Sequence, residues 1–281
     1  MGKIIDGRAV AAEACISIKS RVEALVKKGV QPCLAVILVG DNPASRAYVG
    51  MKEKKAAELG IKTVGHKLAS DTVEADLIAL IHQLNEDDSV HGILVQLPLP
   101  EHMSEERVLL NVSPKKDVDG LHPENAGMLL TGREGFIPCT PKGSVMLVES
   151  TGMDISGKHC VVIGRSNIVG KPAALLMLAK NATVTMCHSR TKDLGEFTRK
   201  ADILISAVGV PNLVTADMIK PGAVVIDVAQ CRVDGAWRGD VDFEAALEVA
   251  SHITPVPGGV GPMTIAMLME NTVEAAEKTL A

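Results

Sequence analysis

Apolar runs of strand length alternate with stretches of helical period along nearly the whole chain. Residues 33–39, 62–68 and 92–95 are strand-like, and apolar positions between them are spaced as on one face of a helix. This alternation predicts an α/β protein with parallel sheets, because parallel strands need a crossover helix between them. The pattern returns in the second half, where we expect further strands at 159–164, 182–187, 202–208 and 223–228.

Two prolines, Pro138 and Pro141, separate these halves. Proline disfavours helix and strand interiors, so we place a domain junction there. The chain is expected to form two domains: an N-terminal α/β domain over residues 1–139, and a Rossmann-type parallel-sheet domain over residues 140–261. A helical pattern over 262–281 is expected to return to the first domain.

Composition narrows the class of protein. Of 281 residues, 47% are hydrophobic and 22% charged, which is typical of a soluble globule, and the net charge of −5 gives no basic footprint for nucleic acid. The six cysteines are widely spaced, without a C-x-x-C pair, which predicts reduced thiols, no metal site and a cytoplasmic location. No apolar stretch approaches the length of a membrane span, so no membrane partner is expected.

Candidate chemistry begins directly after the strand at 33–39. Tyr48, the only tyrosine, and Lys52 are four apart in a predicted helix that follows Asp41-Asn42-Pro43. Side chains at that spacing project from one face. The pair is either part of an amphipathic surface helix, with a half-buried phenol and an extended lysine, or a stacking platform beside a proton-transfer group.

Two more polar groups are expected near strand ends. Gln96 directly follows the strand at 92–95, which Pro98 and Pro100 prevent from continuing. Gln96 therefore lies at the carboxyl end of a strand, and its amide is expected to share a crevice with Lys52. Asp117 and Asp119 flank a valine in a loop that ends at Gly120. Both are solvated turn residues, or one of the two carboxylates accepts N–H groups from an amino-heterocycle.

The Rossmann-type half contains a candidate nucleotide turn. The sequence Gly164-x-Ser166-x-x-x-Gly170 joins a strand to a helix but lacks the middle glycine of G-x-G-x-x-G. The next strand ends in His188-Ser189-Arg190-Thr191, without the acidic residue that NAD sites use for the ribose hydroxyl. With Arg165 in the turn, this chemistry favours the 2′-phosphate of NADP. The alternative is a structural turn with surface charges.

Two later segments could complete a nicotinamide pocket. Residues 206–211, which contain Gly209, and residues 226–228 follow predicted strands. The segment 253–264 is rich in glycine and proline, which predicts a stiff irregular loop that approaches another group closely.

Together these motifs resemble the bifunctional methylenetetrahydrofolate dehydrogenase/cyclohydrolase family over the whole chain. The matching stretches are Gly40-Asp41-Asn42-Pro43-Ala44-Ser45 with Tyr48-x-x-x-Lys52, Gln96-Leu97-Pro98-Leu99-Pro100, Lys116-Asp117-Val118-Asp119-Gly120, Thr140-Pro141-Lys142-Gly143, Gly164-Arg165-Ser166 with Val169-Gly170-x-Pro172, Cys187-His188-Ser189, and Pro255-Val256-Pro257-Gly258-Gly259-Val260-Gly261-Pro262-Met263-Thr264.

The resemblance implies a folate-binding catalytic domain at 1–139 with the helix 262–281, an NADP-binding domain at 140–261, and a homodimer. The expected catalytic residues are Lys52, Tyr48, Gln96 and Asp119. Tyr48, Gln96, Asp119, Pro257, Gly258 and Gly259 are expected to bind substrate. NADP is expected at Gly164, Arg165, Ser166, Val169, Gly170, Ser189, Gly209 and Gln230, and no metal is expected.

The activity implied is NADP-dependent oxidation of 5,10-methylenetetrahydrofolate to 5,10-methenyltetrahydrofolate, followed by hydrolysis to 10-formyltetrahydrofolate. One departure leaves alternatives open: the chain has Ala229-Gln230-Cys231 where the family usually has Gly-Ile-Asn. A monofunctional enzyme weakened in the other step is therefore the runner-up. A different NADP-dependent oxidoreductase and a non-catalytic folate or nucleotide sensor are the rival classes.

Overall fold

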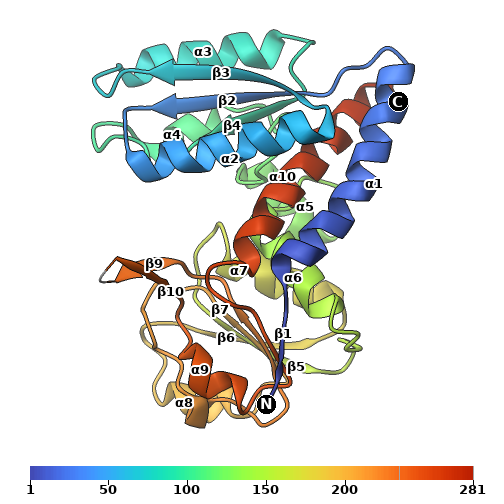
Figure 1. Cartoon of the computed structure of the whole chain (residues 1–281). Helices are drawn as coiled ribbons and strands as arrows, with labels where there is room; N and C mark the ends of the chain where they lie inside the picture. The colour runs from blue at the N-terminus through green and yellow to red at the C-terminus, as the bar shows by residue number, and fades with distance from the viewer. Residues whose placement is uncertain (234, 281) are drawn as a thin grey trace. The chain divides into compact units, whose positions relative to one another are not determined.

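Two parallel sheets organise the chain, one in each of two units (Figure 1). The structure is a computed structural model that describes residues 1–233 and 235–280. Residues 14–137 and 265–281 form one unit, here the N-terminal unit. Residues 1–13 and 138–264 form the other, here the Rossmann unit. This arrangement confirms the predicted two-domain α/β fold.

The sheet of the N-terminal unit has the order β3-β2-β4, and all its strands are parallel. The central strand β2 is buried along its whole length, which explains its uninterrupted apolar sequence. The strand bounds equal those predicted: β2 (Cys33–Val39), β3 (Lys62–Leu68) and β4 (Gly92–Val95). The helices are α1 (Gly7–Lys27, which begins in the Rossmann unit), α2 (Pro43–Leu59), α3 (Glu74–Glu86), α4 (Glu105–Leu110) and α5 (Pro123–Thr131).

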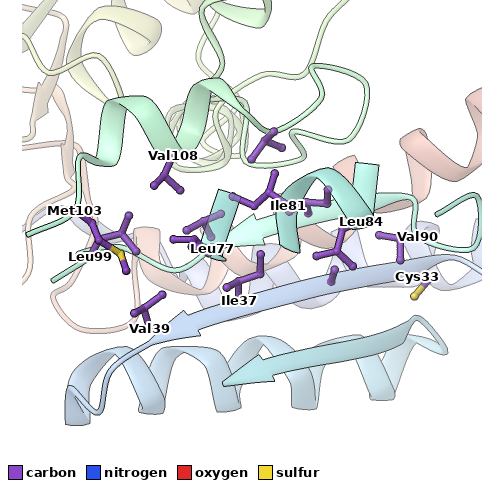
Figure 2. Close-up of a cluster of buried hydrophobic side chains, with 14 residues drawn as sticks. Cys33, Ile37, Val39, Leu77, Ile81, Leu84, Val90, Leu99, Met103 and Val108 are labelled. Atoms are coloured by element: carbon purple, nitrogen blue, oxygen red, sulfur yellow. The ribbon is translucent and has the colours of Figure 1, made fainter. Parts of the chain in front are cut away.

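One face of this sheet is covered by α3 and α4. Figure 2 shows Leu77, Ile81 and Leu84 of α3 pointing toward Ile37 of β2. The three α3 residues are spaced four and three apart and form its buried stripe. Helix α2 lies on the other face of β2 (Figures 1 and 2). The sheet is therefore held between two helical layers, as its two-sided apolar pattern requires.

The C-terminal helix α10 (Val260–Glu277) belongs in part to the N-terminal unit, as predicted. Asn271 is fully buried, and its amide N–H groups donate to the carbonyls of Val118 at 2.8 Å and Ile137 at 3.0 Å. Arg21 of α1 binds Glu277 through both carboxylate oxygens, at 2.9 and 2.6 Å. These contacts connect α10 to α1 and to the backbone at Val118 and Ile137.

The Rossmann unit has a six-stranded parallel sheet of order β1-β11-β8-β7-β5-β6. Its strands are β1 (Lys3–Ile4), β5 (His159–Ile163), β6 (Thr183–Cys187), β7 (Ile203–Ser206), β8 (Val224–Asp227) and β11 (His252–Ile253). Its helices are α6 (Cys139–Glu149), α7 (Gly170–Ala179), α8 (Leu194–Thr198) and α9 (Phe243–Leu247), and β9 (Cys231–Val233) pairs antiparallel with β10 (Ala236–Arg238).

The first 13 residues lie in the Rossmann unit, whereas the sequence pattern predicts a first domain over residues 1–139. The reason is β1, which pairs with β11 at the edge of the large sheet. A two-residue strand has no detectable period, so no sequence pattern predicts β1. In the described ranges no helix is both long and apolar enough to cross a membrane.

Candidate active site

Lys52 occupies a position that an apolar residue would normally take. Helix α2 starts at Asn42, whose side chain accepts the N–H groups of Ala44 and Ser45, and it ends at Gly60 in the left-handed conformation. The buried face of the helix comprises Ser45, Val49, Lys52, Ala56 and Leu59. The lysine thus continues the core stripe, and only 8% of it is exposed.

Among the described residues, the amine of Lys52 has one polar partner. Its Nζ donates to Oε1 of Gln96 at 2.9 Å. The Gln96 amide nitrogen donates to the carbonyl of Leu97 at 2.6 Å, so the amide oxygen is the atom that faces the lysine. Burying an ammonium group beside a neutral amide costs free energy that a surface lysine avoids. Such a placement is typical of functional sites rather than of packing.

Tyr48 lies one turn before Lys52 on the same side of α2 and is half-buried. Burial raises the pKa of its phenol, so the hydroxyl stays protonated at neutral pH. The side chain therefore combines an apolar ring with a protonated hydroxyl group.

The structure separates the roles of the two loop aspartates. Asp117 is 4% exposed, and its Oδ2 accepts the N–H of His122 at 2.7 Å and the amide of Asn125 at 2.9 Å. Burial raises the pKa of Asp117 to about 6, although the hydrogen bonds from His122 and Asn125 act to lower it. Asp119 is half-buried, and within the described ranges its carboxylate accepts no hydrogen bond. Asp117 therefore shapes the loop, and Asp119 is the carboxylate left for a ligand.

The Asp119 loop lies along β4, the strand that leads to Gln96. The N–H of Ile93 donates to the Lys116 carbonyl at 2.7 Å, and Asp117 pairs with Ile93 as an isolated parallel bridge. Gly120 follows with φ +71°, a conformation that favours glycine. The loop runs parallel to β4, so Asp119 follows in the direction of the carboxyl end of the strand, where Gln96 lies.

In the Rossmann unit the strand order reverses beside β5. The chain passes from β5 to β6 on one side and returns to β7 on the other. Open α/β sheets bind ligands at the carboxyl ends of strands at such a reversal. At this point the chain packs closely: a Cβ on Gly164 would lie 2.5 Å from the Ala207 carbonyl oxygen, and one on Gly170 would lie 2.3 Å from that of Gly164. Both glycines are required sterically.

The expected 2′-phosphate residues follow neighbouring strands. Arg165 comes directly after Gly164, whose N–H donates to the Cys187 carbonyl at 2.9 Å, and Ser189 follows Cys187 by two residues. Both side chains are exposed, and Arg165 has no polar partner among the residues that the structure describes. The register of β5 and β6 thus brings a cation and a hydroxyl to one edge of the sheet.

The hydroxyl of Ser166, which was expected to bind NADP, instead accepts hydrogen bonds from its own turn. Its Oγ accepts the N–H groups of Val169 at 3.2 Å and Gly170 at 3.3 Å. These are N–H groups at the start of α7, so Ser166 shapes the turn from within. Gly209 has φ +74°, and the half-buried Gln230 has its amide nitrogen 3.0 Å from where a Cβ on Gly261 would lie.

The glycine- and proline-rich loop packs within the Rossmann unit. A Cβ on Gly7 would lie 1.8 Å from the Gly259 carbonyl oxygen, and one on Gly259 would lie 2.7 Å from that of Pro255. Gly258 and Gly259 are buried, whereas Pro257 is exposed. The predicted close approach is therefore to the start of α1.

The structure joins Lys52 directly to Gln96 and places Arg165 and Ser189 on adjacent strand ends. Pro257, Gly258 and Gly259 lie in the other unit from Lys52. Sequence reasoning missed several buried polar residues that hold the loops: Asn125, Asn271 and Asp240. For Asn271 a signal existed, because it interrupts the apolar pattern of the last helix.

Comparison with known proteins agrees with this arrangement. The catalytic-domain model of tetrahydrofolate dehydrogenase/cyclohydrolase matches residues 5–119, and the NAD(P)-binding-domain model matches residues 138–280. The bifunctional protein FolD of Exiguobacterium sibiricum is 56% identical over 277 residues, which cover 99% of this chain and 100% of that protein.

Solved structures give the same result. The bifunctional FolD methylenetetrahydrofolate dehydrogenase/cyclohydrolase of Campylobacter jejuni is 50% identical with a TM-score of 0.97, covering 99% of this chain and 100% of that one. The Trypanosoma brucei dehydrogenase-cyclohydrolase, complexed with NADP cofactor and inhibitor, is 39% identical with a TM-score of 0.93, covering 99% and 98%. These matches confirm the resemblance found in the motifs: the chain belongs to the tetrahydrofolate dehydrogenase/cyclohydrolase family.

Proposed function

We propose that this protein oxidises 5,10-methylenetetrahydrofolate to 5,10-methenyltetrahydrofolate with NADP⁺ and then hydrolyses that product to 10-formyltetrahydrofolate. The observation that carries the proposal is the buried Lys52 amine bonded to Gln96 at 2.9 Å. A dehydrogenase that only moves a hydride needs no protein acid or base. A hydrolase does, and this amine is suitably placed to be one.

Asp119 and Tyr48 would hold the folate. The carboxylate of Asp119 lacks an intramolecular donor in the described part of the chain, so it can accept paired N–H groups from a pterin. The half-buried Tyr48 ring offers a surface on which the substrate rings can stack. These contacts would fix the one-carbon bridge relative to Lys52.

Lys52 would carry the proton of the hydrolytic step. Water adds to the cationic carbon and loses a proton, and the carbon–nitrogen bond to N5 then breaks as that nitrogen gains one. Lys52 would accept the water proton and return it to the leaving nitrogen, as a general acid–base group does. Gln96 would keep the amine directed, because its own amide is held by Leu97.

The Rossmann unit has residues that fit NADP. When bound, NADP⁺ supplies the hydride acceptor. Arg165 and Ser189 would bind its 2′-phosphate, since the Arg165 guanidinium has no polar partner among the described residues and its geometry matches a phosphate group. Gly164 and Gly170 would keep the turn narrow enough for backbone to approach the cofactor, and Val169, Gly209 and Gln230 would line the same edge.

The altered segment Ala229-Gln230-Cys231 is compatible with both activities. Asp227 accepts the N–H of Ala229, a backbone bond that does not depend on the side chains in the segment. We also propose, from the family alone, a cytoplasmic homodimer.

Replacing Lys52 by Met should lower methenyltetrahydrofolate hydrolysis at least ~100-fold, because it removes the general acid–base group. NADP⁺ binding should not change. The matched control is Lys54→Met, which removes an exposed lysine from the same helix and should have no effect. Both can be measured from the loss of methenyltetrahydrofolate absorbance; unchanged turnover in the Lys52 variant would refute the role.

Asp119→Ala should raise the KM for methylenetetrahydrofolate roughly 10- to 100-fold, the effect of losing a charge-assisted hydrogen bond. The exposed Asp88 serves as control, since Asp88→Ala removes the same charge outside the site. If steady-state kinetics show the same folate KM in both variants, Asp119 is only a turn residue.

Arg165→Ala should reduce the preference for NADP⁺ over NAD⁺ roughly 10- to 100-fold, because the 2′-phosphate loses its cation. Arg199→Ala removes an exposed arginine near the amino end of β7 and should keep the preference. The ratio of kcat/KM for the two cofactors is the measurement, and an unaltered ratio for Arg165→Ala would contradict the assignment.

A further inference from the structure

The Rossmann unit contains two buried carboxyl groups that the mechanism above does not use. Asp227 ends β8 and is 3% exposed, and Asp240 follows β10 and is 0% exposed. Within the described ranges neither has a lysine, arginine or histidine partner. Buried carboxylates without a cation are costly unless N–H and O–H groups satisfy them.

Asp240 is satisfied by one loop. Its Oδ2 accepts the hydroxyl of Ser206 at 2.8 Å and the N–H of Val208 at 2.8 Å, and its Oδ1 accepts the N–H of Val210 at 2.8 Å. Three donors from the stretch 206–210 thus converge on one carboxylate. Gly209 lies between two of these anchors with φ +74°. The carboxylate therefore fixes the backbone of this stretch.

Asp227 fixes Asp240 in turn. Its Oδ1 accepts the N–H of Asp240 at 3.0 Å, and its Oδ2 accepts the N–H of Val241 at 2.9 Å. A Cβ on Gly239 would lie 1.9 Å from Oδ2, so this contact requires glycine there. Burial is the main cause that raises the pKa of Asp227 to about 7, and the charge of Asp240 adds to the rise.

The stretch fixed by Asp240 borders the nucleotide turn. Ser206 pairs with Ile163 of β5 on one side and with Asp227 of β8 on the other. The next residue, Ala207, is the one whose carbonyl leaves no room for a Cβ on Gly164. The stretch 206–210 therefore forms one wall of the crevice at the strand reversal, where the dinucleotide is expected.

We propose that Asp240 is a positioning residue for the dehydrogenase step, whose buried carboxylate holds residues 206–210 as a rigid wall of the nicotinamide site, with Asp227 holding Asp240. This inference rests on the proposed function. A wall fixed before the cofactor binds reduces the ordering that binding and hydride transfer require. Asp240 itself does not need to touch the cofactor.

The test is Asp240→Asn in the full-length protein, assayed for both reactions. The amide is similar in size but turns one acceptor into a donor that faces N–H or O–H groups. The KM for NADP⁺ should rise about 10-fold or more and the dehydrogenase kcat should fall. Hydrolysis of supplied methenyltetrahydrofolate, which depends on Lys52 in the other unit, should stay within about two-fold of wild type.

Ser206→Ala is the milder second variant, because it removes one of the three donors and leaves the backbone bonds intact. It should raise the KM for NADP⁺ about five-fold, the effect of one hydrogen bond. Asp202→Asn is the matched control. Asp202 directly precedes β7, at the opposite end of the strands from Ser206. Its carboxylate accepts the Lys220 ammonium at 2.6 Å and the N–H of His159 at 2.9 Å. It should leave the KM for NADP⁺ unchanged.

Two results would overturn the proposal. One is a KM for NADP⁺ and a dehydrogenase kcat within two-fold of wild type in both Asp240→Asn and Ser206→Ala. The other is a parallel fall of both activities in both variants, which would assign Asp240 to general stability. A wild-type protein without dehydrogenase activity would instead refute the proposed function, so the two failures are distinguishable.

Discussion

The candidate active site is organised around one hydrogen bond, from the amine of Lys52 to the amide oxygen of Gln96 at 2.9 Å. A lysine in the core stripe of a helix lowers stability compared with an apolar residue, and a neutral amide compensates only part of that cost. Ser45, Val49, Ala56 and Leu59 on the same face are ordinary helix-packing residues. The presence of a lysine on this buried face is therefore best explained by a chemical role for its amine.

Parallel-strand geometry collects the remaining groups. In the N-terminal unit, α2 starts where β2 ends and Gln96 follows β4, so two side chains distant in sequence meet at one sheet edge. The loop with Asp119 reaches the same strand because Asp117 pairs beside Ile93. The Rossmann unit uses the same principle, with the loops after β5, β6, β7 and β8 at one edge. Buried carboxyl and amide groups then fix these loops.

Much of this was predictable from the sequence, and the failures have physical reasons. The strands at 33–39 and 92–95 are predictable because each is a continuous apolar run bounded by turn residues, and the mixed sequence at 62–68 allowed a prediction of the approximate position of β3. Strand β1 and the pair β9 and β10 escaped because two or three residues carry no period. Asp119 could be named as a candidate, but only the structure shows that its neighbour Asp117 is the buried, fully bonded member. Asp240 was missed because its partners are the Ser206 hydroxyl and two backbone N–H groups about 30 residues earlier, an arrangement that leaves no local pattern in a sequence.

The most direct test of the central claim is a product analysis with Lys52→Arg, given methylenetetrahydrofolate and NADP⁺ together. Arginine keeps the positive charge and donates hydrogen bonds, but it does not release its proton near neutral pH. If the Lys52 amine transfers the proton, NADPH should form while methenyltetrahydrofolate accumulates and 10-formyltetrahydrofolate does not. Formation of 10-formyltetrahydrofolate at the wild-type rate would contradict the account, because a fixed cation would then be sufficient for hydrolysis.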